Sequence, residues 1–238
     1  MTKQAIYRLK YSQIRSGWKN SETIYKESIV SNIKNQECRI LDIGCGHGEL
    51  MADVYQNLEN AYGLDPDASA IEKNHVIKNK FVGMAEKMPF ESNFFDIVVC
   101  AWVLEHLSNP KEVFTEINRV LKPGGKFIFI TPNIYNYNVW IIRLIPQRFH
   151  DFFTKRLYGR QENDTFKKFY LVNSEFSIDK LLFDVGFKKS KFILNGDPSY
   201  ISFNNFLFWF SCKLEQVIDK YFEFSKVHII GIYEKKLN

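Results

Sequence analysis

Residues 38–50 read CRILDIGCGHGEL, and this stretch decides the fold. Its apolar beginning predicts a buried strand, and the alternating glycines Gly44, Gly46 and Gly48 predict a tight turn that leads into a helix. Glycine allows positive φ and lets another molecule approach the backbone closely. The first N–H groups of the following helix have no partner within the helix, so they can bind a ligand. The stretch therefore predicts a ligand-binding turn between a strand and a helix.

Short apolar runs alternate with longer mixed segments as far as Pro132. After the strand at 38–44, we expect buried strands at 61–65, 80–83, 95–101 and 126–132. The helices expected between them cover 48–58, 67–75 and 110–121, and 122–125 is predicted as a turn. Strands that are buried on both faces and separated by helices indicate a doubly wound parallel sheet of the α/β class. Ligands in such folds bind at the carboxyl ends of the strands.

The second half of the chain is rich in aromatic and basic residues and shows little periodicity at first. Further along, the pattern predicts a helix at 174–184 and strands at 187–194 and 226–236. We interpret residues 1–238 as one domain in which two insertions leave one sheet. Its expected parts are an N-terminal helical segment at 1–37, a ligand-binding core at 38–132 and cap insertions at 133–172 and 197–224.

The composition narrows the class of protein. The 238 residues are 45% hydrophobic and 25% charged with a net charge of +5, which excludes collagen-like, coiled-coil and disordered classes. The charge alone is too small to indicate a nucleic-acid partner. The four cysteines, Cys38, Cys45, Cys100 and Cys212, lack C-x-x-C spacing, so we expect reduced thiols and neither disulfides nor a zinc site. Without an apolar leader or an apolar run of about 18 residues, the sequence predicts a cytoplasmic protein.

Three further motifs follow the glycine turn. Asp65 ends the second strand, where its carboxylate can accept hydrogen bonds from both hydroxyls of a ribose or cap the next helix. The segment GMAEKMPF, residues 83–90, follows the third strand, and FDIVVCAWVLEHL, residues 95–107, contains the fourth. Taken in order, the four motifs resemble those of class I S-adenosylmethionine-dependent methyltransferases, and the resemblance covers residues 38–132.

The resemblance implies a Rossmann-like, seven-stranded, mostly parallel sheet whose last strand runs antiparallel beside the fifth. It also implies an enzyme that uses S-adenosylmethionine as its cofactor. The residues it assigns to cofactor binding are Asp42, Gly44, Cys45, Gly46, His47, Gly48, Asp65, Pro66, Met84, Ala85, Glu86, Ala101 and Trp102. Met84 stands where the family usually has an aspartate that accepts from adenine. Because a thioether is a poor acceptor, we expect adenine to be held mainly by packing.

Two histidines are candidate catalytic bases. Methyl transfer from a sulfonium is an in-line displacement, which needs a base only when the acceptor arrives protonated. His106 follows the fourth strand, near the expected methyl group, and His150 lies in the first insertion. The alternative role for His106 is purely structural, at the start of a helix.

Residues 104–106, Leu-Glu-His, also resemble quinone-biosynthesis methyltransferases, in which this helix can supply metal-binding carboxylates. Those enzymes have another glutamate four residues before the histidine, where this chain has Trp102, so we expect no metal. The Asn-Pro-Pro-Tyr motif of enzymes that methylate the amino groups of DNA bases is absent after the fourth strand. We therefore expect no nucleic-acid partner.

Residues 131–160 resemble a segment of bacterial methyltransferases found with surface-glycan or lipid-linked saccharide synthesis. The cationic side chains among the aromatic ones are Arg143, Arg148, Lys155, Arg156 and Arg160. Guanidinium groups can pair with phosphate or carboxylate groups. We therefore expect O-methylation of a small molecule or of a saccharide on an anionic or lipid carrier, although these residues could instead form the core of the cap.

Two other function classes remain open. A non-catalytic module could keep the cofactor-binding fold, but the complete glycine turn and Asp65 argue against it. A nicotinamide oxidoreductase is disfavoured because Gly48 comes one residue earlier than the third glycine of G-x-G-x-x-G.

Residues 202–224, SFNNFLFWFSCKLEQVIDKYFEF, have helical spacing. The face predicted to be apolar consists of Phe203, Phe206, Leu207, Phe210, Leu214, Val217, Ile218 and Tyr221, with Phe208 and Trp209 off it. Such a helix suits peripheral contact with the inner face of a membrane or a homodimer seam. Packing against the cap is the alternative.

Overall fold

The computed structural model describes residues 1–56, 58–139 and 167–237. The chain forms two compact units. The sheet unit comprises Glu22–Thr131, Lys168–Ile193 and Ile229–Asn238, and the helical unit comprises Met1–Ser21, Pro132–Lys167 and Leu194–His228. The organisation as one domain with cap insertions stays a prediction.

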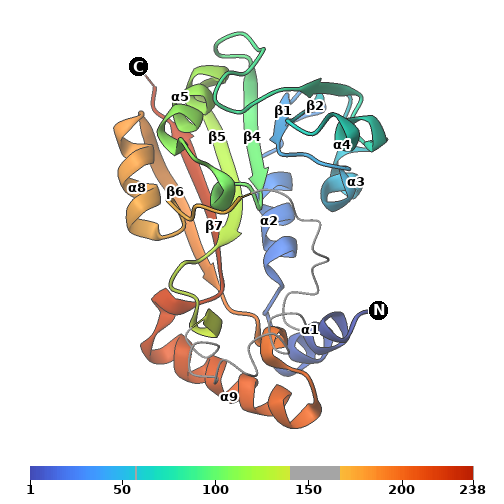
Figure 1. Cartoon of the computed structure of the whole chain (residues 1–238), viewed down its shortest axis with the longest axis vertical. Coiled ribbons are helices and arrows are strands. Elements are labelled where there is room, and N and C mark those ends of the chain that lie inside the picture. The colour runs from blue at the N-terminus through green and yellow to red at the C-terminus, as the bar shows by residue number, and fades with distance from the viewer. Residues whose placement is uncertain (57, 140–166, 238) are drawn as a thin grey trace. The chain divides into compact units, whose positions relative to one another are not determined.

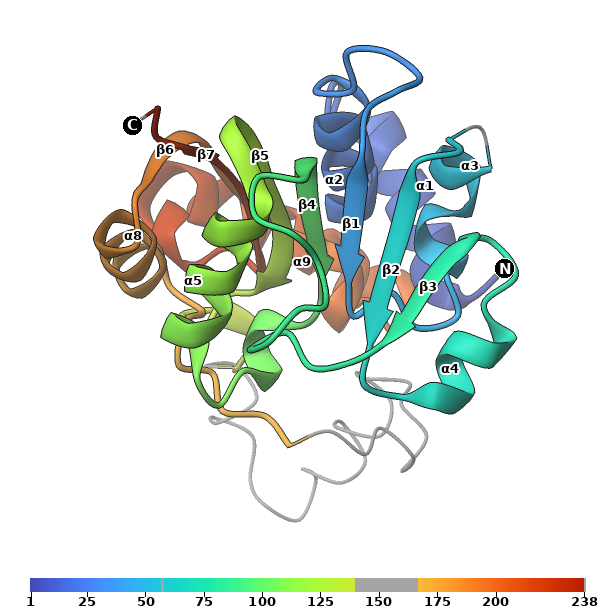
Figure 2. The same ribbon diagram turned by 90° about the horizontal axis from the view of Figure 1, so that it is seen from above.

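A seven-stranded sheet has the strand order β3-β2-β1-β4-β5-β7-β6 (Figures 1 and 2). Its strands are β1 (Ile40–Ile43), β2 (Ala61–Asp65), β3 (Asn79–Val82), β4 (Phe95–Ala101), β5 (Leu121–Pro132), β6 (Phe187–Asn195) and β7 (His228–Lys235). Strand β1 pairs in parallel with β2 and β4, and the parallel pairing continues from β2 to β3 and from β4 to β5. The predicted Rossmann-like α/β sheet is confirmed.

Strand β7 lies between β5 and β6 and runs antiparallel to β5. The end of β5 meets the start of β7, because the Asn133 N–H donates to the Val227 carbonyl at 3.0 Å. The start of β5 meets the end of β7, where the Lys126 ammonium pairs with the Glu234 carboxylate. The antiparallel strand expected beside the fifth is therefore confirmed.

The sheet buries two faces of different composition. In β5, Phe127 and Phe129 alternate with Ile128 and Ile130, and all four side chains are fully buried. The ring of Phe127 lies 5.2 Å from that of Phe129 and 5.9 Å from that of Phe114, measured between centroids. The two isoleucines belong to a largely aliphatic cluster on the opposite face. Because both faces are covered at the centre of the sheet, β4 and the second half of β5 are almost entirely apolar.

The helices of the sheet unit are α2 (Ser21–Val30), α3 (Ala52–Tyr55), α4 (Ala68–Lys73), α5 (Pro110–Val120) and α8 (Glu175–Asp184), with 3-10 turns η1 (Glu49–Met51) and η2 (Leu104–His106). Figure 2 shows α5 and α8 on one side of the sheet and α2 and α3 on the other. Helix α8 begins where predicted, because the Ser174 side chain accepts a hydrogen bond from the Ser177 N–H.

Two local predictions in the sheet unit are wrong. The helix expected at 48–58 is replaced by η1 and the four-residue α3, because Met51 leaves the helical conformation between them. The turn expected at 122–125 lies inside β5. There the register shifts from the pair Phe95–Leu121 to the pair Ile97–Lys126, so the Pro-Gly-Gly segment forms an irregularity within the strand.

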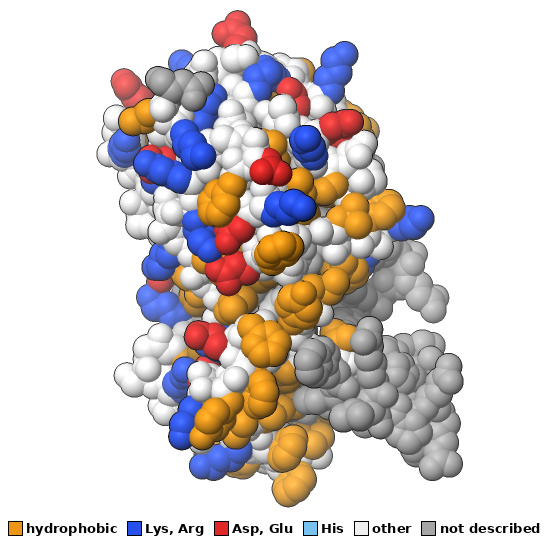
Figure 3. Space-filling model, turned by 90° about the vertical axis from the view of Figure 1, so that its left-hand side faces the viewer, with side chains coloured by type: hydrophobic (Ala, Val, Ile, Leu, Met, Phe, Trp, Pro, Cys, Tyr) orange, Lys and Arg blue, Asp and Glu red, His pale blue; other side chains and the backbone are white. Residues whose placement is uncertain are grey.

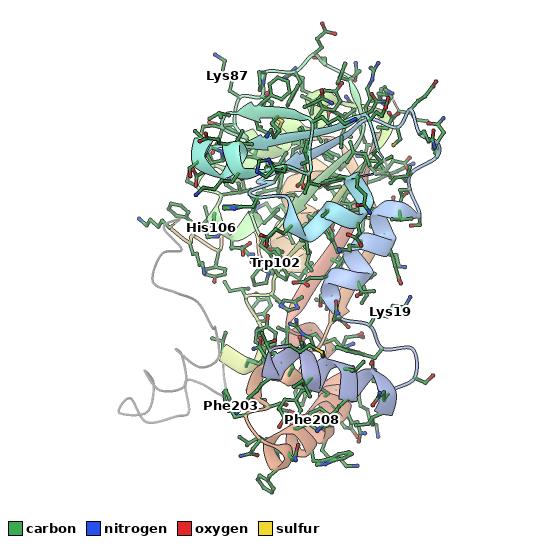
Figure 4. All side chains as sticks on the ribbon, turned by 90° about the vertical axis from the view of Figure 1, so that its right-hand side faces the viewer. Lys19, Lys87, Trp102, His106, Phe203 and Phe208 are labelled. Atoms are coloured by element: carbon green, nitrogen blue, oxygen red, sulfur yellow. The ribbon has the colours of Figure 1, made fainter. Side chains whose placement is uncertain are left out.

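The helical unit contains α1 (Lys3–Ile14) and α9 (Asn205–Tyr221), with 3-10 turns η4 (Pro198–Ile201) and η5 (Glu223–Ser225). Tyr7 of α1 stacks on Phe208 of α9 with ring centroids 5.0 Å apart. Figure 4 shows Phe208 where the two helices meet. This contact joins the N-terminal segment to a helix about 200 residues further along the chain.

The predicted apolar face of α9 coincides with its buried face only at Ile218. The buried side chains are Phe208, Ser211, Cys212, Glu215 and Ile218. Ser211 and Glu215 can be buried because each has a partner: the Ser211 hydroxyl lies 2.9 Å from that of Ser202, and Glu215 accepts from the Tyr137 hydroxyl. None of the described helices has the length and apolar character needed to cross a membrane.

Candidate cofactor site

The glycine loop between β1 and η1 depends on positive φ angles. Gly44, Gly46 and Gly48 have φ values of +70°, +47° and +79°. The Gly44 N–H donates to the Leu64 carbonyl at 2.8 Å, which holds the loop against β2. A Cβ atom at Gly44 would lie 2.3 Å from Val103 Cγ2, so this position must be glycine. Val103, whose role the sequence did not indicate, thus packs the segment after β4 against the loop.

The Asp65 carboxylate joins the glycine loop to the end of β2. Its Oδ2 accepts from the Gly46 N–H and its Oδ1 from the Asp67 N–H, each at 2.9 Å. Helix α4 is capped by Asp67, which accepts from the Ser69 N–H, so Asp65 is not its cap. An ionised carboxylate offers about four acceptor positions, and Asp65 therefore keeps acceptor capacity for a ligand.

Asn74 fixes the other side of the glycine loop, and sequence reasoning missed it. The side chain is fully buried at the end of α4. Its Nδ2 donates to the Gly46 carbonyl at 3.0 Å, and its Oδ1 accepts from the N–H groups of Val76 and Ile77. A Cβ atom at Gly48 would lie 2.7 Å from Asn74 Oδ1. An asparagine after a short helix carries no signal of a partner 28 residues earlier.

A cavity of about 240 Å³ opens against the glycine loop at the carboxyl ends of β1 and β4. Its lining residues are Asp42, Gly44, Cys45, His47, Gly48, Glu49, Leu50, Met51, Ala101 and Trp102. The candidate residues that do not line it are Gly46, Asp65, Pro66, Met84, Ala85, Glu86 and His106. A larger cavity of about 650 Å³ lies at the amino ends of the strands, around Arg39 and Lys122–Lys126. We assign the site to the smaller cavity, because doubly wound folds bind ligands at the carboxyl ends.

Asp42 is the buried carboxylate of this cavity, and the exposed Glu49 also lines it. Its Oδ2 accepts a hydrogen bond from the Tyr55 hydroxyl at 2.9 Å. Burial raises the pKa of Asp42 from 3.8 to about 7, the Tyr55 hydrogen bond lowers this pKa, and the Asp65 carboxylate raises it. Asp42 therefore changes its charge near neutral pH. Tyr55 follows Asp42 by 13 residues, in α3, and no motif marks the pairing.

A protein-family model matches the part of the chain that contains the glycine loop and the cavity. Residues 41–129 match the model of the family described as "Methyltransferase domain". This chain contains a class I S-adenosylmethionine-dependent methyltransferase domain.

Curated relatives resemble part of this chain. An uncharacterized protein of Methanocaldococcus jannaschii is 37% identical over 142 residues, which are 59% of this chain and 51% of that protein. A ubiquinone biosynthesis O-methyltransferase of Pseudomonas aeruginosa is 32% identical over 133 residues, covering 48% of this chain and 56% of the relative. The chain thus spans about half the length of these curated relatives.

Structural similarity to solved proteins covers more of the chain than sequence similarity does. A complex of the Haloferax volcanii Trm112 methyltransferase activator with a methyltransferase contains a chain that superposes with a TM-score of 0.62 at 17% identity. The superposition covers 99% of this chain and 95% of that chain, and it shows a common fold.

Trp102 of the methyltransferase domain has an unusual backbone. Its φ of +59° lies in the left-handed region, which large side chains rarely adopt. The Trp102 N–H donates to the Ile130 carbonyl at 3.0 Å, and this bond to β5 holds the conformation. Ala101 and Trp102 both line the cavity, so the strained residue faces the site.

The segment expected to hold adenine follows β3. The Gly83 N–H donates to the Asp65 carbonyl at 3.1 Å, which places residues 84–86 beside the end of β2. Met84 is 57% exposed, so its thioether is open to solvent. Pro66 is exposed as well, and Ala85 and Glu86 are half-buried. Their roles in binding stay predictions.

His106 ends η2 and is half-buried, with its N–H donating to the Val103 carbonyl at 2.8 Å. Figure 4 shows Trp102 and His106 on the segment that follows β4. His150 lies outside the described residues, as do Arg143, Arg148, Lys155, Arg156 and Arg160.

Glu105 was not among the predicted site residues. It is 1% exposed, and its Oε2 accepts from the Thr131 hydroxyl at 3.1 Å. The Asn173 side chain donates to the same hydroxyl oxygen at 2.6 Å. These contacts tie the segment after β4 to the end of β5 and to the residue before the cap of α8.

The four thiols of the chain are protonated at neutral pH, because burial raises the pKa of each. All four cysteines are buried and none forms a disulfide. Burial, with smaller contributions from Asp42 and Asp65, raises the pKa of Cys45 to about 12. Cys45 therefore contributes packing to the cavity wall. Across the described ranges, no three His, Cys, Asp or Glu side chains gather as ligands of a metal ion, and metal independence stays a prediction.

Proposed function

We propose that this protein transfers the methyl group of S-adenosylmethionine to an oxygen atom of a small molecule or of a saccharide on an anionic or lipid carrier. The observation that carries the proposal is the joint placement of the glycine loop, the Asp65 carboxylate and the Asp42 cavity at one edge of the sheet. The names of the curated relatives, among them a ubiquinone biosynthesis O-methyltransferase, support O-methylation.

Three features of this chain fit the donor. Asp42 would pair with the α-ammonium group of its methionine part, because an ionised carboxylate in a cavity favours a cation. The Asp65 carboxylate would accept hydrogen bonds from the ribose hydroxyls with its remaining acceptor positions. Gly46 leaves open space where a side chain would be, so the backbone is accessible there. When bound, S-adenosylmethionine supplies a methyl group activated by a sulfonium sulfur.

The protein's part in the reaction would be positioning. The loop, held by Asp65 and Asn74, would fix the donor, and Trp102 would limit water at the cavity. The acceptor oxygen forms its bond to the methyl carbon while the carbon–sulfur bond breaks, and the electron pair stays on sulfur. A hydroxyl acceptor must also lose its proton, for which His106 and His150 are the candidate bases.

A thermal-shift comparison tests the cofactor. S-adenosylhomocysteine in large excess should raise the melting temperature by about 5–10 °C, whereas NAD should not. Asp65→Ala should abolish the shift, because it removes the ribose acceptor and the bond to Gly46. Asp67→Ala is the matched control: it removes the cap of α4 but should keep the shift. A shift with NAD, or a normal shift in Asp65→Ala, would contradict the assignment.

A transfer assay separates the enzyme from a non-catalytic cofactor-binding module. The full chain is incubated with methyl-labelled S-adenosylmethionine and fractionated metabolite, nucleotide-sugar and lipid extracts. Label in a saccharide or lipid fraction supports the proposed acceptor. Binding of S-adenosylhomocysteine without label in any fraction would favour the non-catalytic alternative.

A further inference from the structure

Helix α9 exposes the kind of side chain that most helices bury. The exposed apolar residues of α9 and η5 are Phe206, Trp209, Phe210, Val217, Tyr221, Phe222 and Phe224. The members within α9 recur at spacings of three, four and seven residues, so they share one face of the helix. Phe206 is 78% exposed and Tyr221 62%. Figure 3 shows hydrophobic side chains gathered over this helix, with Lys and Arg side chains beside them.

The acidic and basic residues of α9 lie on different faces of the helix. Its two acidic residues do not lie on the exposed face: Glu215 is 1% exposed, and Asp219 pairs with Arg15 and Lys226. Its two basic residues, Lys213 and Lys220, are both exposed. The exposed face of α9 is therefore aromatic and cationic.

Helix α1 adds positive charge beside this face. Residues 1–21 contain five Lys and Arg and no Asp or Glu. The Lys10 ammonium lies 3.4 Å from the Asn205 Oδ1 at the start of α9, next to Phe206. The described residues of the helical unit contain nine Lys and Arg against four Asp and Glu, whereas the sheet unit contains 18 against 20. The excess positive charge of the chain is thus concentrated in the helical unit.

We propose that the exposed face of α9, with the cationic side chains of α1, binds the surface of an anionic lipid bilayer. The 17-residue helix would lie parallel to the membrane, with Phe206, Trp209 and Phe210 inserted at the level of the headgroups and the lysines paired with lipid phosphates. Aromatic side chains favour this interfacial depth.

A second copy of the chain fits the face less well than lipid does. In a two-fold dimer the same patch meets itself, which brings Lys213 and Lys220 of both copies together. The exposed Glu223 of η5 already pairs with Lys226 of its own chain. An anionic lipid surface neutralises Lys213 and Lys220. The inference concerns the helical unit alone and does not depend on methyl transfer.

Vesicle flotation of the full chain tests the proposal. The protein should float with phosphatidylcholine vesicles that contain about a quarter phosphatidylglycerol, and much less with pure phosphatidylcholine or in high salt. Phe206→Glu should lower the partition coefficient more than tenfold. Lys213→Glu should lower it at least about fivefold, which is the effect expected for one basic residue near an anionic surface.

The matched control is Phe176→Glu. Phe176 lies on α8 of the sheet unit and is 78% exposed, the same fraction as Phe206, so it tests whether any exposed phenylalanine would give the effect. It should float like the wild type. An unchanged melting temperature and an unchanged shift with S-adenosylhomocysteine would show that Phe206→Glu still folds.

Fluorescence gives a second, independent measurement. The emission of the wild type should shift to shorter wavelength on anionic vesicles, and Trp209→Phe should lose most of this shift while it still floats. Three outcomes would overturn the proposal: a wild type that stays unbound with anionic vesicles, equal flotation of Phe206→Glu, or a wild-type dimer that Phe206→Glu converts to a monomer in the absence of lipid binding.

Discussion

The sheet unit and the helical unit each contain a buried carboxylate that is paired with a tyrosine: Asp42 in the first and Glu215 in the second. Each is a buried carboxylate that accepts a hydrogen bond from a tyrosine hydroxyl, of Tyr55 and of Tyr137. Burial raises the pKa of each carboxyl group to about 7. The two pairs therefore have similar charge states at neutral pH.

Their surroundings differ. Asp42 lines the cavity beside the glycine loop, whereas the Glu215 carboxylate rests on the backbone of Gly196, where an added Cβ would lie 2.0 Å from its Oε2. A proton on Asp42 thus changes the charge that lines this cavity, whereas a proton on Glu215 changes the charge in the packed interior beside α9. The comparison teaches that a buried carboxylate with a raised pKa can act on a ligand only where a cavity adjoins it.

The largest effect should come from filling the space beside Glu215. Gly196→Ala forces the carboxylate away from Tyr137 and leaves a buried charge without its partner. We expect a loss of about 3 kcal/mol in stability, which corresponds to a fall of about 6–12 °C in the melting temperature. Circular dichroism measures the melt, and S-adenosylhomocysteine should still bind to the sheet unit.

Gly17→Ala is the control for this substitution. Gly17 lies in the helical unit and has a φ of +81° with nothing within 4 Å of an added Cβ, so only backbone strain changes there. A loss as large in Gly17→Ala as in Gly196→Ala would show that the contact with Glu215 is not responsible.

A smaller effect is expected on ligand affinity. Asp42→Asn removes the buried negative charge of the cavity, so the affinity for S-adenosylhomocysteine, which carries an α-ammonium group, should fall about tenfold. Glu215→Gln removes the equivalent charge in the helical unit and should change the affinity less than twofold. Isothermal titration calorimetry at pH 8, where both carboxyl groups are mostly ionised, makes the comparison. Equal losses of affinity in the two variants would show that the cavity beside Asp42 does not distinguish it from Glu215.

The smallest effect is on the pH dependence of stability. In the unfolded chain both carboxyl groups titrate near pH 4, and in the folded protein near 7, so the folded state holds more protons between these values. Each group therefore lowers stability as the pH rises from about 4 to about 7. His228 acts in the opposite direction between about pH 4 and 6.5, because burial lowers its pKa to about 4.

Glu215→Gln and Asp42→Asn should each flatten this fall. From pH 6 to pH 7 the melting temperature of each variant should drop about 2–4 °C less than that of the wild type. His228→Gln should steepen the fall. Identical pH profiles for all four proteins would mean that these groups are not the source of the dependence.

The sequence predicted the parts of the sheet unit that depend on continuous apolar runs. Strands β2 and β4 have the predicted bounds. Strands that are buried on both faces are nearly continuous apolar runs, so the first and last residues of the run mark the ends of the strand. The turn at Gly44–Gly48 and the carboxylate at Asp65 were recognised because their spacing is local. Asn74, Tyr55 and Val103 were missed because their contacts join segments that only the tertiary fold brings together.

The helical unit shows what apolar periodicity left open for α9. The sequence left open whether the aromatic face through Phe206 and Phe210 contacts a membrane, a second copy or the cap. In the structure both side chains are exposed, and the helix buries Ser211 and Glu215. Their partners, Ser202 and Tyr137, lie outside the helix, so its own sequence gives no indication that polar residues belong inside.

The contact between Gly48 and Asn74 also limits how these two positions can evolve. A side chain at 48 would occupy the place of the Asn74 amide, and a smaller residue at 74 would release both the Gly46 carbonyl and the N–H groups of Val76 and Ile77. A substitution at either position alone should therefore disturb the glycine loop. Descendants of this chain should either keep both residues or replace them as a pair.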